Sequence, residues 1–339
     1  MREFNTLLDN RSNLLFIAPT GWGKTTLLLE LMQNSNKSWI YLSPLRALAN
    51  EFYIRAESLG GVVLIKSAAE ARQLLKNGLK FKLLIITPEL LSESLLQSFE
   101  KDTHFVFDEI HLFMYWGKSF RPKLIESLES ILSLEFSTLS LTATMSEDLL
   151  SLWKSFTGQM GLSNYVINLG NHRLKKWPCK ITYIPNHFKE NLLDELTLMK
   201  TEHTKLIFCK YRQEVERVKK RLIDEGKIVL SCIGGGTNEF SLELSKYEKP
   251  DFIVSTSALS HGVNLPKISV VYISYKVSNF DFWIQMSGRA GRRGERFTLF
   301  THDYEFIPKK QNILSIVYLL LLKLKNMIYP YELRRYFNK

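Results

Sequence analysis

The stretch Ala18-Pro-Thr-Gly-Trp-Gly-Lys-Thr25 decides the fold of this chain. It follows the apolar run NLLFIA (13–18) and leads into LLLELM (27–32), whose leucine spacing is that of a helix. A short strand, a glycine-rich turn and a helix are therefore expected in that order. Because this unit is typical of a parallel strand followed by a helical crossover, it predicts an α/β fold built on a parallel sheet.

Short apolar runs of the same kind alternate with helical patterns along the chain. They are NLLFIA, SWIYLS, GVVLI, KLLIIT, HFVFDE and TLSLTA in the first half, and KLIFC, IVLSC, DFIVST and SVVYIS in the second. The first series ends near Ala143 and the second begins near Ile181, with a mixed polar stretch (158–178) as the expected linker. We therefore predict two tandem domains, each a parallel sheet flanked by helices, and a tail, over residues 1–165, 175–310 and 311–339.

The glycine-rich turn has the composition of a phosphate-binding loop. Gly21 and Gly23 allow the backbone to turn tightly and approach an anion, and the N–H groups of the following helix point at it. Lys24 adds a positive charge, and the hydroxyl of Thr25 is a ligand for Mg²⁺. The first position of the pattern is Ala18, where glycine is common. The nucleotide-binding residues predicted from this loop are Thr20, Gly21, Gly23, Lys24, Thr25 and Thr26.

A pair of carboxylates follows another apolar strand. The run His104–Phe107 leads into Asp108 and Glu109, which places both at the carboxyl end of a strand, where open α/β sheets bind their ligands. Phosphoryl transfer to water needs a carboxylate for the metal ion and a group that positions or deprotonates the water. We assign Asp108 to Mg²⁺ and Glu109 to the water. With the phosphate loop upstream, the pair predicts hydrolysis of a nucleoside triphosphate.

The order of these motifs resembles that of the superfamily 2 DExH-box helicases, over nearly the whole chain. Beside Asp108-Glu-Ile-His111, the stretch Ser43–Glu51 (SPLRALANE) is similar to motif Ia, and Thr87-Pro-Glu89 is similar to motif Ib. The residues that this resemblance places on a sugar–phosphate backbone are Pro44, Arg46, Thr87, Pro88 and Glu89. Thr142-Ala-Thr144 is similar to motif III. The residues that the resemblance implies in linking hydrolysis to the strand-binding face are His111, Thr142 and Thr144.

Two further motifs lie in the second half of the chain. Ser255–Pro266 (STSALSHGVNLP) resembles motif V, and Gln285–Arg292 (QMSGRAGR) resembles motif VI. A loose phosphoryl-transfer transition state spreads negative charge, which an arginine from another domain stabilises. Arg289 and Arg292 are the arginines expected in that role. The resemblance adds one catalytic residue and two nucleotide-binding residues, which are Gln285, Gly262 and Asn264.

The resemblance implies two RecA-like domains with ATP and Mg²⁺ in the cleft between them, and a closure that depends on the bound nucleotide. It implies movement along, and unwinding of, single-stranded or partly duplex nucleic acid, with DNA favoured and 3′–5′ polarity. The net charge of +11 suits such a polyanionic partner. Two alternatives stay open: a nucleotide-gated clamp or RNA-remodelling ATPase without processive unwinding, and a small-molecule phosphotransferase.

Finer details of the motifs point to particular branches of the superfamily. PLRALANE, GVNLP and QMSGRAGR are most similar to the superkiller-like branch, whereas only Tyr272–Ile284 separate motifs V and VI, which is too short for a long strand-separating hairpin. APTGWGKT and FDEIH are also similar to the stand-alone helicase subunit of type I CRISPR interference complexes, which implies a protein partner with a nuclease or specificity function.

Two departures from those relatives concern the base and the nuclease. The chain has no glutamine before Gln33, so the residue that reads adenine in many relatives is missing from the expected place. His302-Asp303 is the one adjacent pair of the type found in HD nucleases, and the other histidines are scattered. We therefore expect adenine recognition to be relaxed and any nuclease to reside in a separate chain.

Composition narrows the setting of the protein. Cys179, Cys209 and Cys232 lie far apart in apolar contexts and are predicted to be reduced core residues. The N-terminus lacks the apolar region of a signal peptide, and the longest apolar stretch (313–324) is too short to span a bilayer, so a cytoplasmic protein without membrane contact is expected. The stretch Asn312–Lys325 is predicted to form an apolar helix that packs on the second domain or docks a partner.

Overall fold

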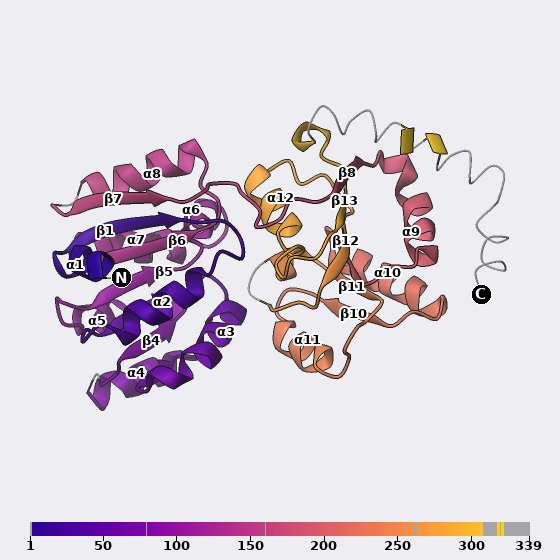
Figure 1. Ribbon diagram of the computed structural model, residues 1–339. Helices are drawn as coiled ribbons and strands as arrows, with labels where there is room; N and C mark the ends of the chain where they lie inside the picture. The colour runs from indigo at the N-terminus through magenta and orange to yellow at the C-terminus, as the bar shows by residue number, and fades with distance from the viewer. Residues whose placement is uncertain are drawn as a thin grey trace. The chain divides into compact units, whose positions relative to one another are not determined.

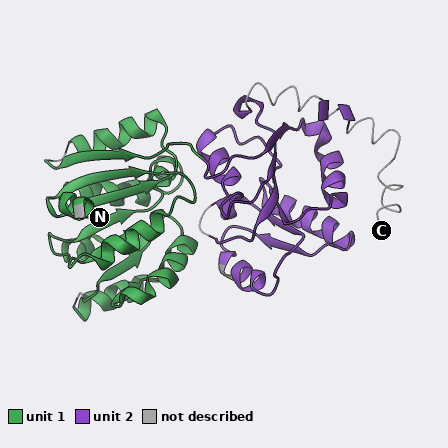
Figure 2. Cartoon of the chain, in the orientation of Figure 1, with its two compact units in different colours: residues 1–173 green, residues 174–339 purple. Residues whose placement is uncertain are grey.

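The computed structural model describes residues 2–78, 80–159, 161–260, 263–307, 317, 318, 320 and 321 (Figure 1). It divides the chain into two compact units, Met1–Arg173 and Leu174–Lys339, which Figure 2 colours separately. Each unit contains its own parallel sheet and its own buried core. The predicted fold class, parallel sheets flanked by helices, is therefore confirmed.

The strands of the first unit form one parallel sheet in the order β3-β4-β2-β5-β6-β1-β7. They are β1 (Ser12–Ile17), β2 (Trp39–Leu42), β3 (Val62–Leu64), β4 (Leu83–Ile86), β5 (His104–Phe107), β6 (Ser137–Thr142) and β7 (Ser163–Asn168). Every residue of the inner strands β2, β4, β5, β6 and β1 is buried, because helices cover both faces of a parallel sheet. This double burial explains why the sequence shows continuous apolar runs instead of an apolar–polar alternation.

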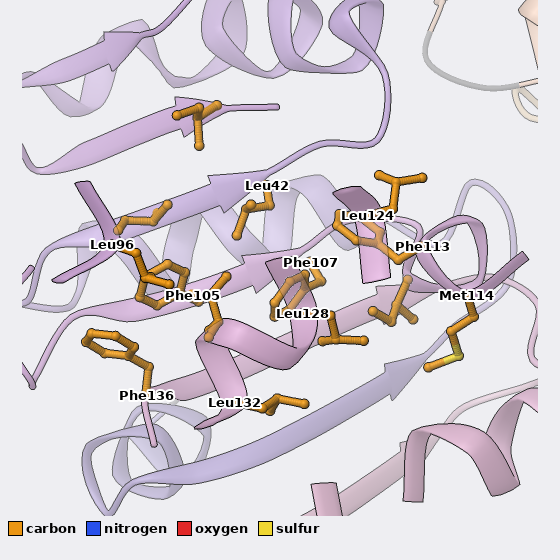
Figure 3. Close-up of a cluster of buried hydrophobic side chains, with 14 of the residues drawn as sticks. Leu42, Leu96, Phe105, Phe107, Phe113, Met114, Leu124, Leu128, Leu132 and Phe136 are labelled. Atoms are coloured by element: carbon orange, nitrogen blue, oxygen red, sulfur yellow. The ribbon is translucent and has the colours of Figure 1, made fainter. Parts of the chain in front are cut away.

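Helices pack on both faces of this first sheet. They are α1 (Arg2–Asp9), α2 (Lys24–Gln33), α3 (Arg46–Ala56), α4 (Ala68–Lys76), α5 (Glu93–Gln97), α6 (Ile110–Gly117), α7 (Lys123–Ser133) and α8 (Glu147–Gly158), with 3₁₀ turns at Glu57–Leu59 and Pro88–Leu90. On one face Phe105 and Phe107 of β5 pack with Phe113 of α6 and Leu128 of α7, as Figure 3 shows. This packing holds α6 in place directly after the Asp108-Glu109 pair.

The second unit repeats the architecture with the strand order β10-β11-β9-β12-β13-β8, again all parallel. Its strands are β8 (Lys180–Tyr183), β9 (Thr204–Phe208), β10 (Val229–Cys232), β11 (Phe252–Ser255), β12 (Ile268–Ile273) and β13 (Thr298–Thr301). Its helices are α9 (Lys189–Leu198), α10 (Arg212–Asp224), α11 (Thr237–Leu244) and α12 (Phe280–Ser287), with 3₁₀ turns at Asn186–Phe188, Ser257–Ser260 and Tyr304–Phe306. One core lies on the face covered by α9 and α10, and another on the face covered by α12.

The boundary between the units lies between Arg173 and Leu174. Strand β7 falls in the stretch where a linker was expected, and it extends three residues past the predicted end of the first domain at residue 165. It pairs with β1 along its whole length, Ser12 with Ser163 through Ile17 with Asn168. Its residues are mostly exposed, which is why SNYVIN carries no apolar signal of a strand.

The predicted burial of the three cysteines is confirmed for two of them and wrong for the third. Cys209 and Cys232 are buried and unpaired as predicted, whereas Cys179 is exposed because it precedes β8 in a surface segment. No helix among the described residues is long and apolar enough to cross a membrane. Most of the predicted apolar helix Asn312–Lys325, like most of the predicted tail 311–339, lies outside the described residues.

Candidate nucleotide and nucleic-acid site

The phosphate loop leaves the carboxyl end of β1 and enters α2 through two glycines in the left-handed region, Gly21 at φ 73° and Gly23 at φ 111°. A Cβ atom added at Gly23 would meet no atom within 4 Å, so the space beside this residue is open. Gly23 caps α2 without a side-chain hydrogen bond, whereas Ser67, Ser92 and Ser146 cap α4, α5 and α8 with theirs. An open helix N-terminus of this kind fits the phosphates of a nucleotide.

The side chain of Lys24 lies over this loop. Its Nζ donates to the carbonyl oxygens of Ala18, at 3.0 Å, and Pro19, at 3.4 Å. A bound phosphate would offer the ammonium a charged acceptor in place of these carbonyls, so the lysine fits its predicted role. Thr20 is buried, Thr25 is half-buried and Thr26 is exposed. Of these three threonines, Thr20 is therefore the least accessible.

Asp108 lies just beyond β5, and its carboxylate is fixed by two donors. The hydroxyl of Tyr41 donates to Oδ2, and the backbone N–H of Glu109 donates to Oδ1 at 3.1 Å. Burial raises the pKa of Asp108, while the Tyr41 hydrogen bond and the charge of Lys24 oppose that rise. The influence of Lys24 means that the carboxylate and the phosphate loop share one electrostatic site, as a Mg²⁺-bound phosphate requires.

Tyr41 was not identified from the sequence. It sits on β2, which pairs with β5 so that Tyr41 lies opposite Val106 and Leu42 opposite Phe107. Burial and the neighbouring Asp108 charge raise the pKa of Tyr41 well above its ordinary value, so it keeps its proton and remains a donor. A tyrosine inside an apolar strand reads as core, and only the pairing of β2 with β5 brings its hydroxyl to the carboxylate.

Glu109 begins α6 with φ 51° and ψ 51°, the left-handed region that a glutamate rarely adopts. Its carboxylate lies 3.4 Å from Nδ1 of His111, which is fully buried. Backbone outliers of this kind concentrate at functional sites, where the surrounding packing holds them. Here the backbone turn aims the two adjacent acidic side chains, Asp108 and Glu109, in different directions.

Hydrogen bonds join His111, which contacts the Glu109 carboxylate, to the predicted motif III. The Thr142 hydroxyl donates to the carbonyl of Thr144 at 2.7 Å and accepts from the Thr144 N–H at 3.1 Å. Its one proton is thus in use, so His111 Nδ1, 2.9 Å away, must be the donor to Thr142 Oγ1. The predicted coupling residues His111, Thr142 and Thr144 are therefore linked by direct contacts, with His111 between the Glu109 carboxylate and the predicted motif III.

The chain of contacts continues into the segment before the second unit. The side-chain amide of Asn171 accepts from the N–H of Met145 at 2.9 Å and donates to its carbonyl at 2.7 Å. Met145 directly follows Thr144, and Asn171 lies two residues before the end of the first unit. Asn171 thus ties motif III to the connecting segment, a contact that sequence reasoning missed because asparagine in a polar stretch reads as loop.

The predicted nucleic-acid contacts lie in the segments that follow β2 and β4, where Arg46 is the first residue of α3 and Pro88 and Glu89 belong to a 3₁₀ turn. Arg46 and Glu89 are exposed. The other three residues, Pro44, Thr87 and Pro88, are buried. Arg121 joins the two loops: its Nη1 donates to the Pro44 carbonyl at 2.6 Å, and its Nε donates to the Glu89 carboxylate at 2.9 Å. The buried members therefore shape the loops, and the exposed Arg46 is the residue available to a phosphate.

The turn after α6 adds side chains that the sequence reading did not include. Phe120 is 64% exposed, and its ring centroid lies 5.7 Å from that of Trp116. The N–H groups of Ser119, Phe120 and Arg121 all donate to the Trp116 carbonyl, so the turn is rigid. An exposed aromatic ring beside Arg121 suits stacking on an unpaired base. The signal was available as the aromatic and basic residues of WGKSFRP (116–122).

The second unit contains motif VI within and after α12. Gln285 and Arg289 are buried, and Arg289 donates through Nη2 to the Val263 carbonyl of motif V. Arg292 is half-buried, and its Nε donates to the Gly288 carbonyl at 2.8 Å. Asn264 is exposed and accepts from Arg293 at 3.2 Å, while Gly262 lies outside the described residues. The structure thus brings motifs V and VI together, with Arg292 more exposed than Arg289.

The His302-Asp303 pair has a structural role. The His302 ring bonds through Nε2 to the Tyr272 hydroxyl at 3.0 Å, and burial lowers the pKa of His302 to about 4. Asp303 accepts the N–H groups of Val277 and Ser278, each through Oδ1 at 2.9 Å. Among the described residues no group of three or more acidic, histidine or cysteine side chains is placed to hold a metal ion. Asp303 thus secures the segment before α12, and His302 is tied to β12.

Comparisons with known proteins agree with these motifs. Residues 2–152 match the DEAD/DEAH box helicase family, and residues 188–294 match the helicase conserved C-terminal domain. The two matches fall one in each unit and together take up most of the chain. The chain therefore belongs to helicase superfamily 2.

Individual proteins are similar to this chain over most of its length. The ATP-dependent DNA helicase Q-like 4B of Arabidopsis thaliana is 26% identical over 87% of this chain, which spans 27% of that protein. The structure of S. cerevisiae Dbp5 bound to RNA and ADP BeF3 has a TM-score of 0.66 at 16% identity, covering 94% of this chain and 85% of Dbp5. Mycobacterium smegmatis Lhr bound to ssDNA and AMP-PNP has a TM-score of 0.61 at 19% identity, covering 88% and 45%.

These likenesses differ in what they establish. The structural matches show that the fold is that of two tandem RecA-like domains, as expected from the motifs. The chain spans only about a quarter to a half of the length of the first curated relatives. The comparisons thus establish the superfamily and the fold.

Proposed function

We propose that this chain hydrolyses ATP with Mg²⁺ and uses the energy to move along and unwind nucleic acid. The observation that carries the proposal is the continuous set of contacts in the first unit. It runs from Asp108 through the Glu109 backbone to the Glu109 side chain, then through His111 to motif III. A phosphatase without a coupled task would have no need for this chain of contacts from the nucleotide site to the rest of the domain.

Each catalytic residue has a defined part in the proposed reaction. Lys24 binds phosphate oxygens, and Thr25 and Asp108 are the oxygen ligands for Mg²⁺, which when bound supplies neutralisation of the phosphate charge. Glu109 orients the attacking water and accepts its proton. We propose that the second unit contributes Gln285, Arg289 and Arg292 to the reaction, and Gly262 and Asn264 to nucleotide binding.

Arg289 and Arg292 differ in burial, so we propose different roles for them. Arg292 is the more exposed, so we propose it as the residue that stabilises the charge developing on the transferred phosphoryl group. Arg289 is almost fully buried against motif V, so we propose that it positions the loop that carries Arg292. Exchange of Arg292 for alanine should slow turnover while leaving ATP affinity intact.

The substrate that we propose is DNA, bound along the loops after β2, β4 and α6 and traversed with 3′–5′ polarity. Arg46 and the rigid turn with Phe120 and Arg121 present charge and an aromatic ring on one side of the first unit. Support for DNA comes from two relatives, a DNA helicase of Arabidopsis thaliana and Lhr in complex with ssDNA, whereas Dbp5 was solved with RNA.

The test is ATP turnover and strand displacement on matched DNA and RNA. A translocase should turn over ATP faster as the single strand lengthens, and displacement should occur from a 3′ DNA tail. Turnover that ignores strand length would indicate a nucleotide-gated clamp, and stimulation by RNA alone would reverse the substrate. Turnover without any response to nucleic acid would contradict the proposal. The Glu109→Gln chain serves as the control for hydrolysis by contaminants.

We also propose that a separate chain supplies nuclease or specificity function, as in type I CRISPR interference. The support is the amino-acid sequence of the phosphate loop and of FDEIH, which is similar to that of the CRISPR helicase subunit. In addition, His302 and Asp303 are engaged in structural hydrogen bonds, so they offer no nuclease site in this chain. Co-expression with the proteins encoded by neighbouring genes, followed by affinity purification, tests this. A stable complex that degrades DNA only when Glu109 is intact is expected, and degradation that is indifferent to Glu109→Gln would contradict the coupling.

A further inference from the structure

A cavity of about 610 Å³ lies in the second unit at the amino ends of β9, β10 and β11. Its walls are the segments that lead into these strands, 197–203, 224–227 and 249–251, together with one residue of β9 itself. None of the residues predicted from motifs V and VI lines it. Its volume is in the range of pockets that hold small molecules.

One charged side chain in this cavity is almost completely buried. Lys205, the second residue of β9, is 5% exposed, and its ammonium lies 4.7 Å from the centroid of the Phe252 ring. Within the part of the chain that the structure describes, the ammonium has no hydrogen bond and no ion pair. A cation–π contact offsets only part of the cost of taking a charge out of water. The cavity is therefore lined by an ammonium that receives no acceptor from the described residues.

Other charged groups surround Lys205 from every wall. The cationic or titratable ones are Lys200, His203, Lys227 and Lys249, and the acidic ones are Asp224, Glu225 and Asp251. The Asp251 carboxylate accepts from the Ile228 N–H at 2.9 Å, so one of its oxygens is turned to the backbone. Lysines from separate walls and carboxylates at the rim together make a mixed surface, which suits a ligand with both anionic and hydroxyl groups.

We propose that this cavity binds a small phosphorylated molecule that also carries hydroxyl groups, such as a sugar phosphate or a nucleotide. Lys205, with Lys227 and Lys249, takes the phosphate, because lysine ammoniums act as point charges toward phosphate oxygens. The carboxylates accept the hydroxyl protons of the ligand. The site belongs to the face of the sheet covered by α9 and α10, whereas Ala290 of motif VI packs on the other face.

The ionisation of Lys205 agrees with this geometry. Burial lowers the pKa of Lys205 to about 8, with the Asp251 charge opposing and the Lys227 and Lys249 charges adding to the effect. A phosphate beside the ammonium favours its charged form, so ligand binding raises this pKa and takes up a proton. Affinity should therefore fall as the pH rises through about 8.

The test uses the full chain with Lys24→Ala, which disables the phosphate loop, and calorimetric titration with ribose 5-phosphate and AMP at pH 7. Saturable binding of at least one of them is expected, with none for ribose or adenosine. Lys205→Met should weaken that binding about tenfold or more, because a charged partner of the phosphate is lost. Lys220→Gln is the matched control, since Lys220 is an exposed lysine on α10 outside the cavity, and it should change nothing.

Several outcomes would overturn the proposal. They are no binding of either phosphorylated probe, equal binding of the probe without phosphate, or an affinity that Lys205→Met leaves unchanged. If circular dichroism shows that Lys205→Met does not fold, the Lys227→Gln, Lys249→Gln chain replaces it, because both lysines lie outside the core. Binding is measured without ATP turnover, so failure here leaves the proposed helicase function standing, and failure of that function leaves this site testable.

Discussion

Asp108 in the first unit is half-buried and Lys205 in the second is buried, and the two charged groups have opposite kinds of surroundings. Asp108 receives hydrogen bonds from the Tyr41 hydroxyl and the Glu109 N–H and faces the charge of Lys24. The Lys205 ammonium lies over the Phe252 ring, and the charges that influence its pKa act without a hydrogen bond or ion pair to it in the described part of the chain. The protein itself therefore supplies the hydrogen bonds of Asp108, whereas for Lys205 we propose that a bound ligand supplies them.

The comparison also explains why only one of these groups has a sequence signature. Asp108 belongs to the consecutive residues Asp108 to His111, which follow the end of β5 and form a recognisable motif. The surroundings of Lys205 come from separate loops that meet only in the folded sheet. A motif search therefore finds the first and passes over the second, although desolvation shifts the pKa of both, as is common for functional ionisable groups.

The largest effect that we expect is on the first of these sites. Glu109→Gln should lower the rate of ATP hydrolysis by about a thousandfold, because the amide neither accepts the proton of water nor carries its charge. Nucleotide affinity should stay intact. Turnover and nucleotide binding, measured side by side by phosphate release and fluorescence titration, provide the check. Undiminished hydrolysis would remove Glu109 from its assigned role, whereas Lys24→Ala should lose binding itself.

At Lys205, removal of the buried charge should stabilise the second unit. The pKa of Lys205 is about 8 in the folded chain and 10.5 in the unfolded one, so folding releases a proton between these values and stability rises with pH there. Lys205→Met should raise the free energy of unfolding by roughly 2 kcal/mol at pH 7, and the gain should shrink as the pH rises from about 8 to 10.5. Denaturant unfolding at several pH values measures it.

A destabilised Lys205→Met chain at pH 7, in the absence of added ligand, would mean that the ammonium is satisfied within the protein. In that case the contrast with Asp108 would disappear. The exposed Lys220 again provides the control, because Lys220→Gln should shift stability by less than about 0.5 kcal/mol at any pH.

The hydrogen bond from Tyr41 is the next test of how Asp108 is held. Tyr41→Phe removes the donor and leaves the ring, which stacks on Phe52 with centroids 3.9 Å apart. Mg²⁺-dependent turnover should fall about tenfold, since one charge-assisted hydrogen bond orients the carboxylate. A Mg²⁺ titration of ATPase rate measures it. Tyr53→Phe, at a half-buried tyrosine of α3, should leave the rate unchanged.

The smallest expected effect concerns the link between motif III and the connecting segment. Asn171→Ala removes both hydrogen bonds to Met145. Basal ATP turnover should remain, and stimulation by single-stranded DNA should fall about threefold, because the coupling contact is lost while the catalytic residues stay in place. The ratio of stimulated to basal rate is the readout. Equal loss of both rates would point to a general structural role, and Asn77→Ala on the exposed end of α4 is the control.

Much of the fold was predictable because inner strands of a parallel sheet are apolar over consecutive residues. The apolar runs quoted from the sequence coincide with β1 to β6 and β9 to β12. Strands β7, β8 and β13 were not among those runs. Strand β7 is the clearest case, since it forms an exposed edge and owes its place to pairing with β1 instead of to burial. An edge strand of polar residues has no local pattern that separates it from a linker.

By itself the sequence determined the residues that act as neighbours along the chain: the phosphate loop, the Asp108-Glu109 pair and the superfamily to which they belong. Only the tertiary structure decided which partners complete them. Tyr41 reaches Asp108 through the pairing of β2 with β5, Asn171 reaches Met145 from the connecting segment, and Lys205 is enclosed by three loops. The reason is physical, because short-range motifs follow from backbone chemistry whereas these contacts depend on strand register and on which helix covers which face.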